Sequence, residues 1–234
     1  IKTNVIGAMN LIDAAIDKGV KKVVALSTDK ASSPINLYGA TKLASDKLFT
    51  AGNSYAGSKP TRFCNVRYGN VMGSRGSVIP FFLNIKEQNI LPITHPEMTR
   101  FMITLEEAVE LVWHAFSDME GGETYVKKIP SMKVTDIART VSPHAKHKIV
   151  GVRPGEKIHE QMIGVEDAPF TYEYQDYFKI LPAIHDWDKD VNRIKSGKIV
   201  PGGFSYSSDN NVEQMSIQEL SAWIDANRSK IIGF

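Results

Sequence analysis

Apolar and polar residues follow one another along the chain in blocks that predict strands and helices in turn. Short apolar runs over residues 22–27 and 61–67 are typical of buried parallel strands. Apolar residues recur at helical spacing over about 3–18 and over about 37–53. This alternation of strand and helix predicts an α/β protein built on a doubly wound parallel sheet.

The second half of the chain shows two helix-start patterns. Thr104-Leu105-Glu106-Glu107 and Ser216-Ile217-Gln218-Glu219 each place a hydroxyl three residues before a glutamate, the spacing of a capping box. Residues 165–211 have weak periodicity and predict no element. The remaining expectations are a helix that begins near Phe81, strands over 123–126 and 148–152, and a helix over 135–141.

Composition narrows the class of protein. The chain has 234 residues, of which 42% are hydrophobic and 23% charged, as in an ordinary globular protein. The net charge of +2 argues against a nucleic-acid-binding arm, and the longest apolar run, 78–83, is too short to span a bilayer. A single cysteine, Cys64, excludes an internal disulfide and favours a cytoplasmic setting. No Cys/His cluster has the spacing of a zinc site, so we assign no metal ligand.

The strand over 22–27 ends in chemically active residues. Ser27-Thr28-Asp29-Lys30 follows it, and polar groups at the carboxyl end of a parallel strand lie where open α/β sheets bind ligands. Tyr38 and Lys42 follow one helical turn apart on one face, and an ammonium beside a phenol favours the phenolate. The pair could therefore act as a base, although a solvated helix pair is the alternative.

The same Tyr-x-x-x-Lys spacing recurs at Tyr55 and Lys59, in a Gly/Ser-rich stretch. Only the first pair follows a buried strand that ends in Ser-Thr and a loop that contains Pro34. That context resembles the active site of the extended short-chain dehydrogenase/reductase superfamily. There, a Ser/Thr, a Tyr and a Lys bind a sugar-nucleotide hydroxyl beside a nicotinamide.

Longer motifs carry a closer resemblance, which covers nearly the whole chain. Residues 25–30, 34–42 and 45–49 are similar to the inverting UDP-N-acetylglucosamine 4,6-dehydratases of pseudaminic acid synthesis. Further segments with the same resemblance are 67–71, 73–78, 98–101, 128–133, 153–157 and 204–211. The resemblance implies a lyase of nucleotide-sugar and polysaccharide biosynthesis, connected with flagellin glycosylation. It also implies NADP rather than NAD as cofactor, UDP-N-acetylglucosamine as substrate and a homo-oligomer.

The resemblance also implies roles for the active residues. Tyr38 would be the base on the C4 hydroxyl, Lys42 would lower the pKa of Tyr38 and hold the nicotinamide ribose, and Thr28 would hydrogen-bond the C4 oxygen. Lys30 would remove the C5 proton and Asp29 would assist loss of the C6 hydroxyl, with inversion at C5. Retaining sugar dehydratases carry Asp-Glu where this chain has Asp29-Lys30. The alternative for this pair is a surface ion pair in a loop.

Further binding residues are expected by matching position. Arginine forks suit a diphosphate, asparagine can donate to it, and a glutamate could accept from the uridine ribose. Alternatives are a strand cap for Arg100, an extended residue before proline for Arg153 and a helix-dipole carboxylate for Glu156. The substrate set is Thr28, Asn70, Arg75, Arg100, Arg153 and Glu156, and the cofactor set is Asn4, Ser27, Tyr38, Lys42, Tyr68 and Asn70.

The resemblance divides the chain into two parts. Residues 1–125 would be the remainder of a Rossmann-like NADP-binding domain, with 77–103 contributing to the substrate domain, and 126–234 would be a smaller α/β UDP-sugar domain. No Gly-x-Gly-x-x-Gly occurs in the sequence. We expect the family's Gly-rich loop and first strands, which form the N-terminal half of the Rossmann-like domain, to lie upstream of Ile1. We therefore expect this chain alone to bind NADP poorly and to be inactive.

Two rival functions fit part of the pattern. A UDP-sugar 4-epimerase on the same fold would need Thr28, Tyr38 and Lys42, but not Asp29 and Lys30. An inactive fragment that serves only in assembly would need none of them.

Overall fold

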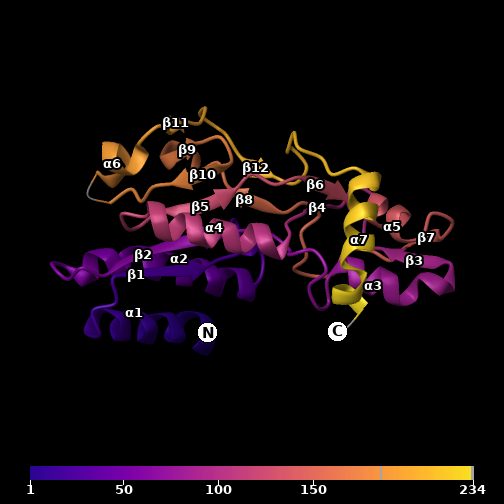
Figure 1. Ribbon diagram of the computed structural model, residues 1–234, viewed down its shortest axis with the longest axis horizontal. Coiled ribbons are helices and arrows are strands. Elements are labelled where there is room, and N and C mark those ends of the chain that lie inside the picture. Colours follow the sequence, from indigo (N-terminus) through magenta and orange to yellow (C-terminus); the bar gives the residue numbers. More distant parts are fainter. Residues whose placement is uncertain (185, 233–234) are drawn as a thin grey trace. The chain divides into compact units, whose positions relative to one another are not determined.

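The computed structural model describes residues 1–184 and 186–232, which form two compact units (Figure 1). The first unit contains residues 1–68, 106–128 and 161–206, and the second contains 69–105, 129–160 and 207–234. Strands and helices alternate through the first unit, which confirms the α/β class. The two units are described separately below.

A mixed sheet forms the centre of the first unit. Its first three strands, β1, β2 and β5, are parallel, and the next three are antiparallel to their neighbours. Among the described residues β1 is one edge of this six-stranded sheet. The strands lie in the order β1 (Lys22–Leu26), β2 (Arg62–Arg67), β5 (Thr124–Lys127), β10 (Tyr177–Ile180), β9 (Thr171–Glu173) and β11 (Lys198–Ile199).

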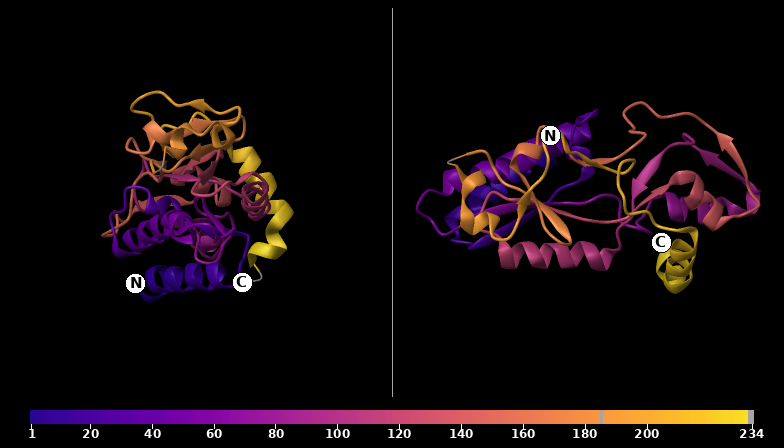
Figure 2. Two further views of the ribbon diagram at one scale, coloured as in Figure 1. Left: turned by 90° about the vertical axis from the view of Figure 1, so that its left-hand side faces the viewer. Right: turned by 90° about the horizontal axis from the view of Figure 1, so that it is seen from above.

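Helices cover both faces of this sheet (Figure 2). The helices α1 (Gly7–Asp17) and α2 (Leu37–Ala56) pack on one face against Phe63, while α4 (Leu105–Asp118) packs on the other. Side chains alternate along a strand, so Cys64 faces α4 and lies 3.6 Å from the sulfur of Met119. Cys64 is fully buried and serves there as a small apolar side chain.

Residues 161–206 belong to the first unit, although the sequence-based division placed them with the substrate domain. Their strands are two to four residues long, too short for a periodic pattern, and β9 to β11 extend the sheet beyond β5. The other elements of this segment are β8 (Gln161–Ile163), α6 (Val191–Ile194) and the 3₁₀ turns Ala168–Phe170 and Trp187–Lys189; β12 (Tyr206–Ser207) follows and pairs with β8.

The second unit packs three helices around small two-stranded sheets. Phe82, Leu91, Met132, Ile137 and Leu220 meet in its core. Its helices are α3 (Val78–Ile85), α5 (Val134–Val141) and α7 (Ile217–Ile232); its strands are β3 (Ile90–Ile93) parallel to β7 (Lys146–Ile149), and β4 (Thr99–Phe101) antiparallel to β6 (Ser131–Lys133); a 3₁₀ turn spans Lys86–Gln88.

The structure tests two of the local predictions, a capping box and a strand position. Ser216 and Glu219 form the predicted capping box, because each backbone N–H is bonded by the other side chain, at 2.7 and 3.2 Å. The strand expected over 148–152 lies instead at β7, because pairing with β3 sets its register. A π-helical turn, Lys2–Ile6, precedes α1. In the described part of the chain, no helix is both long and apolar enough to cross a membrane.

Candidate active site

The loop after β1 continues the pairing of β1 with β2. The Ser27 N–H donates to the Val66 carbonyl at 2.7 Å, and the Asp29 N–H donates to the Tyr68 carbonyl at 3.2 Å. Asp29–Ala31 then forms a 3₁₀ turn that starts at Thr28. The backbone of the predicted site is thus held by the sheet at its carboxyl edge.

Asp29 is the centre of the hydrogen bonds in this loop. Its Oδ1 accepts from Thr28 Oγ1 at 2.7 Å and from Lys30 Nζ at 3.1 Å. The Asp29 side chain is 1% exposed and Lys30 is 32% exposed, so the pair is set into the loop and is not a surface ion pair. Asp29 Oδ2 is buried and has no hydrogen-bond partner among the described residues.

The first turn of α2 packs directly against this loop. Asn36 caps the helix by accepting from the Gly39 N–H at 2.8 Å. A Cβ atom at residue 39 would lie 2.3 Å from the Lys30 carbonyl oxygen, so only glycine allows this approach. Gly39 therefore sets how closely the Lys30 backbone approaches the first turn of α2.

Tyr38 and Lys42 occupy the same end of α2, as predicted. Lys42 Nζ donates to the carbonyl of Leu26, the last residue of β1, at 2.7 Å. Tyr38 is 52% exposed, so its phenol can be reached by a ligand. The structure thus brings Thr28, Asp29, Lys30, Tyr38 and Lys42 together where α2 meets the end of β1.

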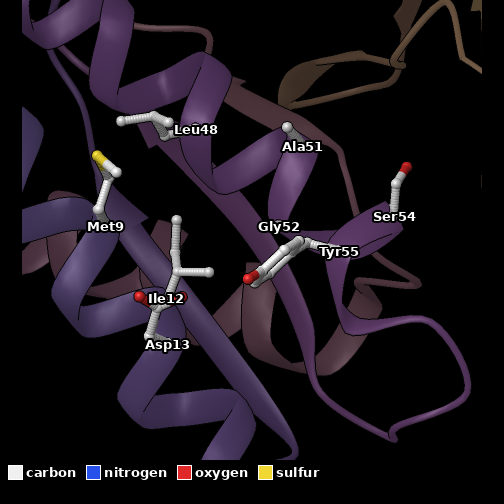
Figure 3. Close-up of a pocket in the computed structure, with 8 residues that line it drawn as sticks. All are labelled: Met9, Ile12, Asp13, Leu48, Ala51, Gly52, Ser54 and Tyr55. Atoms are coloured by element: carbon white, nitrogen blue, oxygen red, sulfur yellow. The ribbon is translucent and has the colours of Figure 1, made fainter.

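The second Tyr/Lys pair lies elsewhere. Tyr55 is exposed near the end of α2, and Lys59 is 3.7 Å from Asp17 of α1. Tyr55 instead lines an apolar groove between α1 and α2, with Met9, Ile12 and Leu48 (Figure 3). This groove contains none of the predicted site residues.

Three predicted cofactor residues support the site from behind. Asn4 donates to Thr41 Oγ1 at 3.0 Å, and Thr41 in turn donates to the Tyr38 carbonyl at 2.9 Å. Ser27 is buried and donates to Asp46 Oδ2 at 2.6 Å. Tyr68 is half-buried, and burial raises its pKa.

The other predicted binding residues belong to the second unit. Arg100 is buried and donates to Glu156 Oε1 at 3.3 Å and to the carbonyls of Thr99, Lys157 and Ile158. The structure thus brings Arg100 and Glu156 together. Asn70, Arg75 and Arg153 are exposed.

Sequence reasoning missed three residues that shape the site. Asp46 and Arg67 form a buried ion pair behind Ser27, and Gly39 permits the approach of Lys30. One signal could have found Asp46, since it lies four residues after Lys42 on the same face of α2. Arg67 and Gly39 carry no such signal, because their roles depend on contacts that are distant in sequence.

The described residues contain no group of three or more His, Cys, Asp or Glu side chains placed to hold a metal ion.

Comparison with known proteins assigns the chain to a family. A family model described as "Polysaccharide biosynthesis protein" matches residues 1–182. The inverting UDP-N-acetylglucosamine 4,6-dehydratase of Campylobacter jejuni subsp. jejuni is 55% identical over 227 residues, which cover 94% of this chain and 68% of that protein. A UDP-glucose 4-epimerase of Rickettsia conorii is 37% identical over 94% of this chain and 66% of its own length.

A solved structure has the same fold over nearly the whole chain. The X-ray structure of Pen from Bacillus thuringiensis superposes with a TM-score of 0.83 and 37% sequence identity, over 96% of this chain and 67% of that one. The dehydratase match has the higher identity over the same share of this chain as the epimerase match. The chain therefore belongs to the polysaccharide biosynthesis protein family and, within it, to the inverting UDP-N-acetylglucosamine 4,6-dehydratases.

Proposed function

We propose that this chain carries the catalytic residues of an NADP-dependent UDP-N-acetylglucosamine 4,6-dehydratase that inverts C5. The observation that carries the proposal is the Asp29–Lys30 pair, whose carboxylate is buried and whose loop packs, through Gly39, against the turn that bears Tyr38. An epimerase has no use for an acid–base pair at this position, whereas elimination of water across C5 and C6 requires one. The 55% identity to a dehydratase supports the same choice.

The first turn of α2 carries the residues proposed for oxidation at C4. Tyr38 takes the proton of the C4 hydroxyl, and Lys42, one turn away on the same face of α2, is proposed to hold the nicotinamide ribose. The Thr28 hydroxyl donates a hydrogen bond to Asp29, so Thr28 Oγ1 can accept a hydrogen bond from the sugar. The accessible phenol and the neighbouring ammonium fit a nicotinamide riboside, which when bound accepts a hydride from C4 and returns it at C6.

Asp29 and Lys30, in the loop after β1, are proposed to carry out the elimination. The C5 proton becomes acidic once C4 is a ketone, and Lys30 can take it only in the neutral form. Asp29 holds the Lys30 ammonium at 3.1 Å, so a proton can pass between the two groups. Asp29, whose Oδ2 is buried without a partner among the described residues, then assists departure of the C6 hydroxyl.

Recognition of the UDP part of the substrate is assigned to residues of the second unit. Arg75, Arg100, Arg153 and Asn70 are proposed to hold the UDP diphosphate, with Glu156 on the uridine ribose. Asn4, Ser27, Tyr68 and Asn70 are proposed to serve the cofactor site, Ser27 from its buried position behind the loop. The division into an NADP-binding and a UDP-sugar domain stays part of this proposal.

The reaction class can be tested with the full gene product. Incubated with UDP-N-acetylglucosamine in D₂O, it should give a product that has lost one water and carries deuterium at C5. The measurement is mass spectrometry with NMR of the product. A product of unchanged mass that is epimeric at C4 would show an epimerase instead.

We propose that the 234-residue chain by itself binds NADP weakly and does not turn over. It contains no Gly-x-Gly-x-x-Gly, the loop whose backbone N–H groups hold a dinucleotide pyrophosphate. Isothermal titration of the purified chain should therefore give no saturable heat at micromolar NADP. Saturable, tight binding would contradict this proposal, and a parallel titration with NAD tests the expected preference for NADP.

A homo-oligomer is also proposed, with the groove between α1 and α2 as its interface. Met9 and Tyr55 are 48% and 75% exposed there, so a second copy would bury apolar surface. Met9→Lys should lower the mass measured by light scattering, whereas Val191→Lys, at an exposed position outside the groove, should not. An unchanged mass for Met9→Lys would exclude this interface. If the chain serves only in assembly, it should form the oligomer without any turnover by the full gene product.

The biological setting follows from the same proposal. The product would enter pseudaminic acid synthesis and flagellin glycosylation. A cytoplasmic location rests on the single, buried cysteine. Cell fractionation followed by immunoblotting tests it.

A further inference from the structure

A buried network of charged and polar groups lies behind the candidate active site. Ser27 Oγ donates to Asp46 Oδ2 at 2.6 Å, and Arg67 Nη2 lies 3.5 Å from the same oxygen. All three residues are at most 6% exposed. They come from the loop after β1, from α2 and from the end of β2, so the network joins three separate segments.

Arg67 extends this network to a fourth segment. Its Nη1 donates to the Met162 carbonyl in β8 at 2.6 Å and lies 3.4 Å from Asp167 Oδ2. The guanidinium is thus placed among two carboxylates and a carbonyl in the interior of the first unit. A charge buried at this depth is stable only while its partners remain in place.

The network is adjacent in sequence to the groups proposed to react, in the loop after β1 and on α2. Ser27 directly precedes Thr28, so fixing the Ser27 side chain fixes the start of the Thr28–Lys30 loop. Asp46 lies one turn after Lys42 on α2, and Asn65 of β2 donates to its backbone carbonyl at 3.2 Å. The same carboxylate therefore connects the loop with the helix that carries Tyr38 and Lys42.

We propose that Asp46 and Arg67 are positioning residues for the dehydration. Arg67 keeps Asp46 as a carboxylate, and Asp46 holds Ser27 so that the Thr28–Lys30 loop stays aligned with Tyr38 and Lys42. Neither residue touches the substrate; both act through Ser27 and α2. This inference rests on the proposed dehydratase function.

The electrostatics of Asp46 support this coupling. Burial raises the pKa of Asp46, and Arg67 is the strongest of the groups that oppose the increase, followed by the Ser27 hydroxyl and the Lys42 ammonium. Asp167 faces the other side of the Arg67 guanidinium. If Arg67 is lost, the cost of burial is opposed less strongly, and the pKa of Asp46 is expected to increase further. Protonation would replace the Asp46 carboxylate by a neutral carboxyl group, which is a weaker acceptor for the Ser27 hydroxyl.

The experiment compares Asp46→Asn, Arg67→Met and the double variant in the full gene product. Asp46→Asn and Arg67→Met should each lower kcat about 10- to 100-fold, because a small displacement of catalytic groups is costly. The KM for UDP-N-acetylglucosamine should stay within about threefold, since substrate contacts are intact. Ser27→Ala, which removes a single hydroxyl, should lower kcat less and serves if the other variants fail to fold.

The pH dependence separates positioning from a loss of stability. In Arg67→Met, kcat should increase by a further factor of about five or more between about pH 6 and about pH 9, relative to the wild type, as Asp46 ionises. Asp46→Asn and the double variant lack that carboxyl, so their ratio between the two pH values should equal the wild-type ratio. An unchanged ratio in Arg67→Met, or a kcat within about twofold of the wild type in both Asp46→Asn and Ser27→Ala, would overturn the inference.

A matched control lies on the opposite face of the same sheet. Asp118 pairs with the buried Lys179 and accepts from Tyr125 at 2.8 Å, on the side covered by α4. Asp118→Asn should lower the Tm and leave kcat and its pH profile unchanged. If the wild-type protein shows no dehydration in D₂O, the proposed function fails. If the wild type is active and the network variants match Asp118→Asn, only the positioning role fails.

Discussion

The contact between the first turn of α2 and the backbone of Lys30 is the constraint on which the candidate site depends. The Lys30 carbonyl lies so close to α2 that a Cβ atom at Gly39 would be 2.3 Å away, a distance that no movement of a side chain could relieve. This contact is backbone against backbone, so it sets the position of the loop independently of any rotamer. It holds the loop that carries Asp29 and Lys30 against the first turn of α2, which carries Tyr38, and neither element alone would form the site.

Charge compensation around this contact is organised in two layers. In the first, Asp29 accepts from both Thr28 and Lys30, so the hydroxyl and the amine are oriented by a single buried oxygen. In the second, Asp46 and Arg67 hold Ser27 from the interior. Fixed polar groups of this kind need little rearrangement during a reaction, which is how protein sites favour the formation of charge.

The sequence predicted the parts of the site that depend on local order. Strand, loop and helix around Thr28, Tyr38 and Lys42 have clear patterns, and the structure confirms these elements. The burial expected of the strand was wrong, because β1 is an edge strand among the described residues and its side chains are exposed or half-buried. The sequence could not predict the burial of Asp29, the acceptors of Arg100 or the partners of Arg67, because these depend on chain segments up to about a hundred residues apart. For the same reason the short strands within 161–206 were missed, since their pairing, and not their composition, makes them part of the sheet.

The central claim is that Lys30 makes this site one for elimination, beyond the oxidation that Tyr38 and Lys42 support. The most direct test is Lys30→Ala in the full gene product, with reduced cofactor followed by absorbance and deuterium at C5 by NMR in D₂O. Our account predicts that the variant still forms reduced cofactor with UDP-N-acetylglucosamine but exchanges no C5 proton and releases no water. Lys47→Ala, at an exposed position on α2, should behave as the wild type. Exchange at C5 or full turnover by Lys30→Ala would contradict the claim.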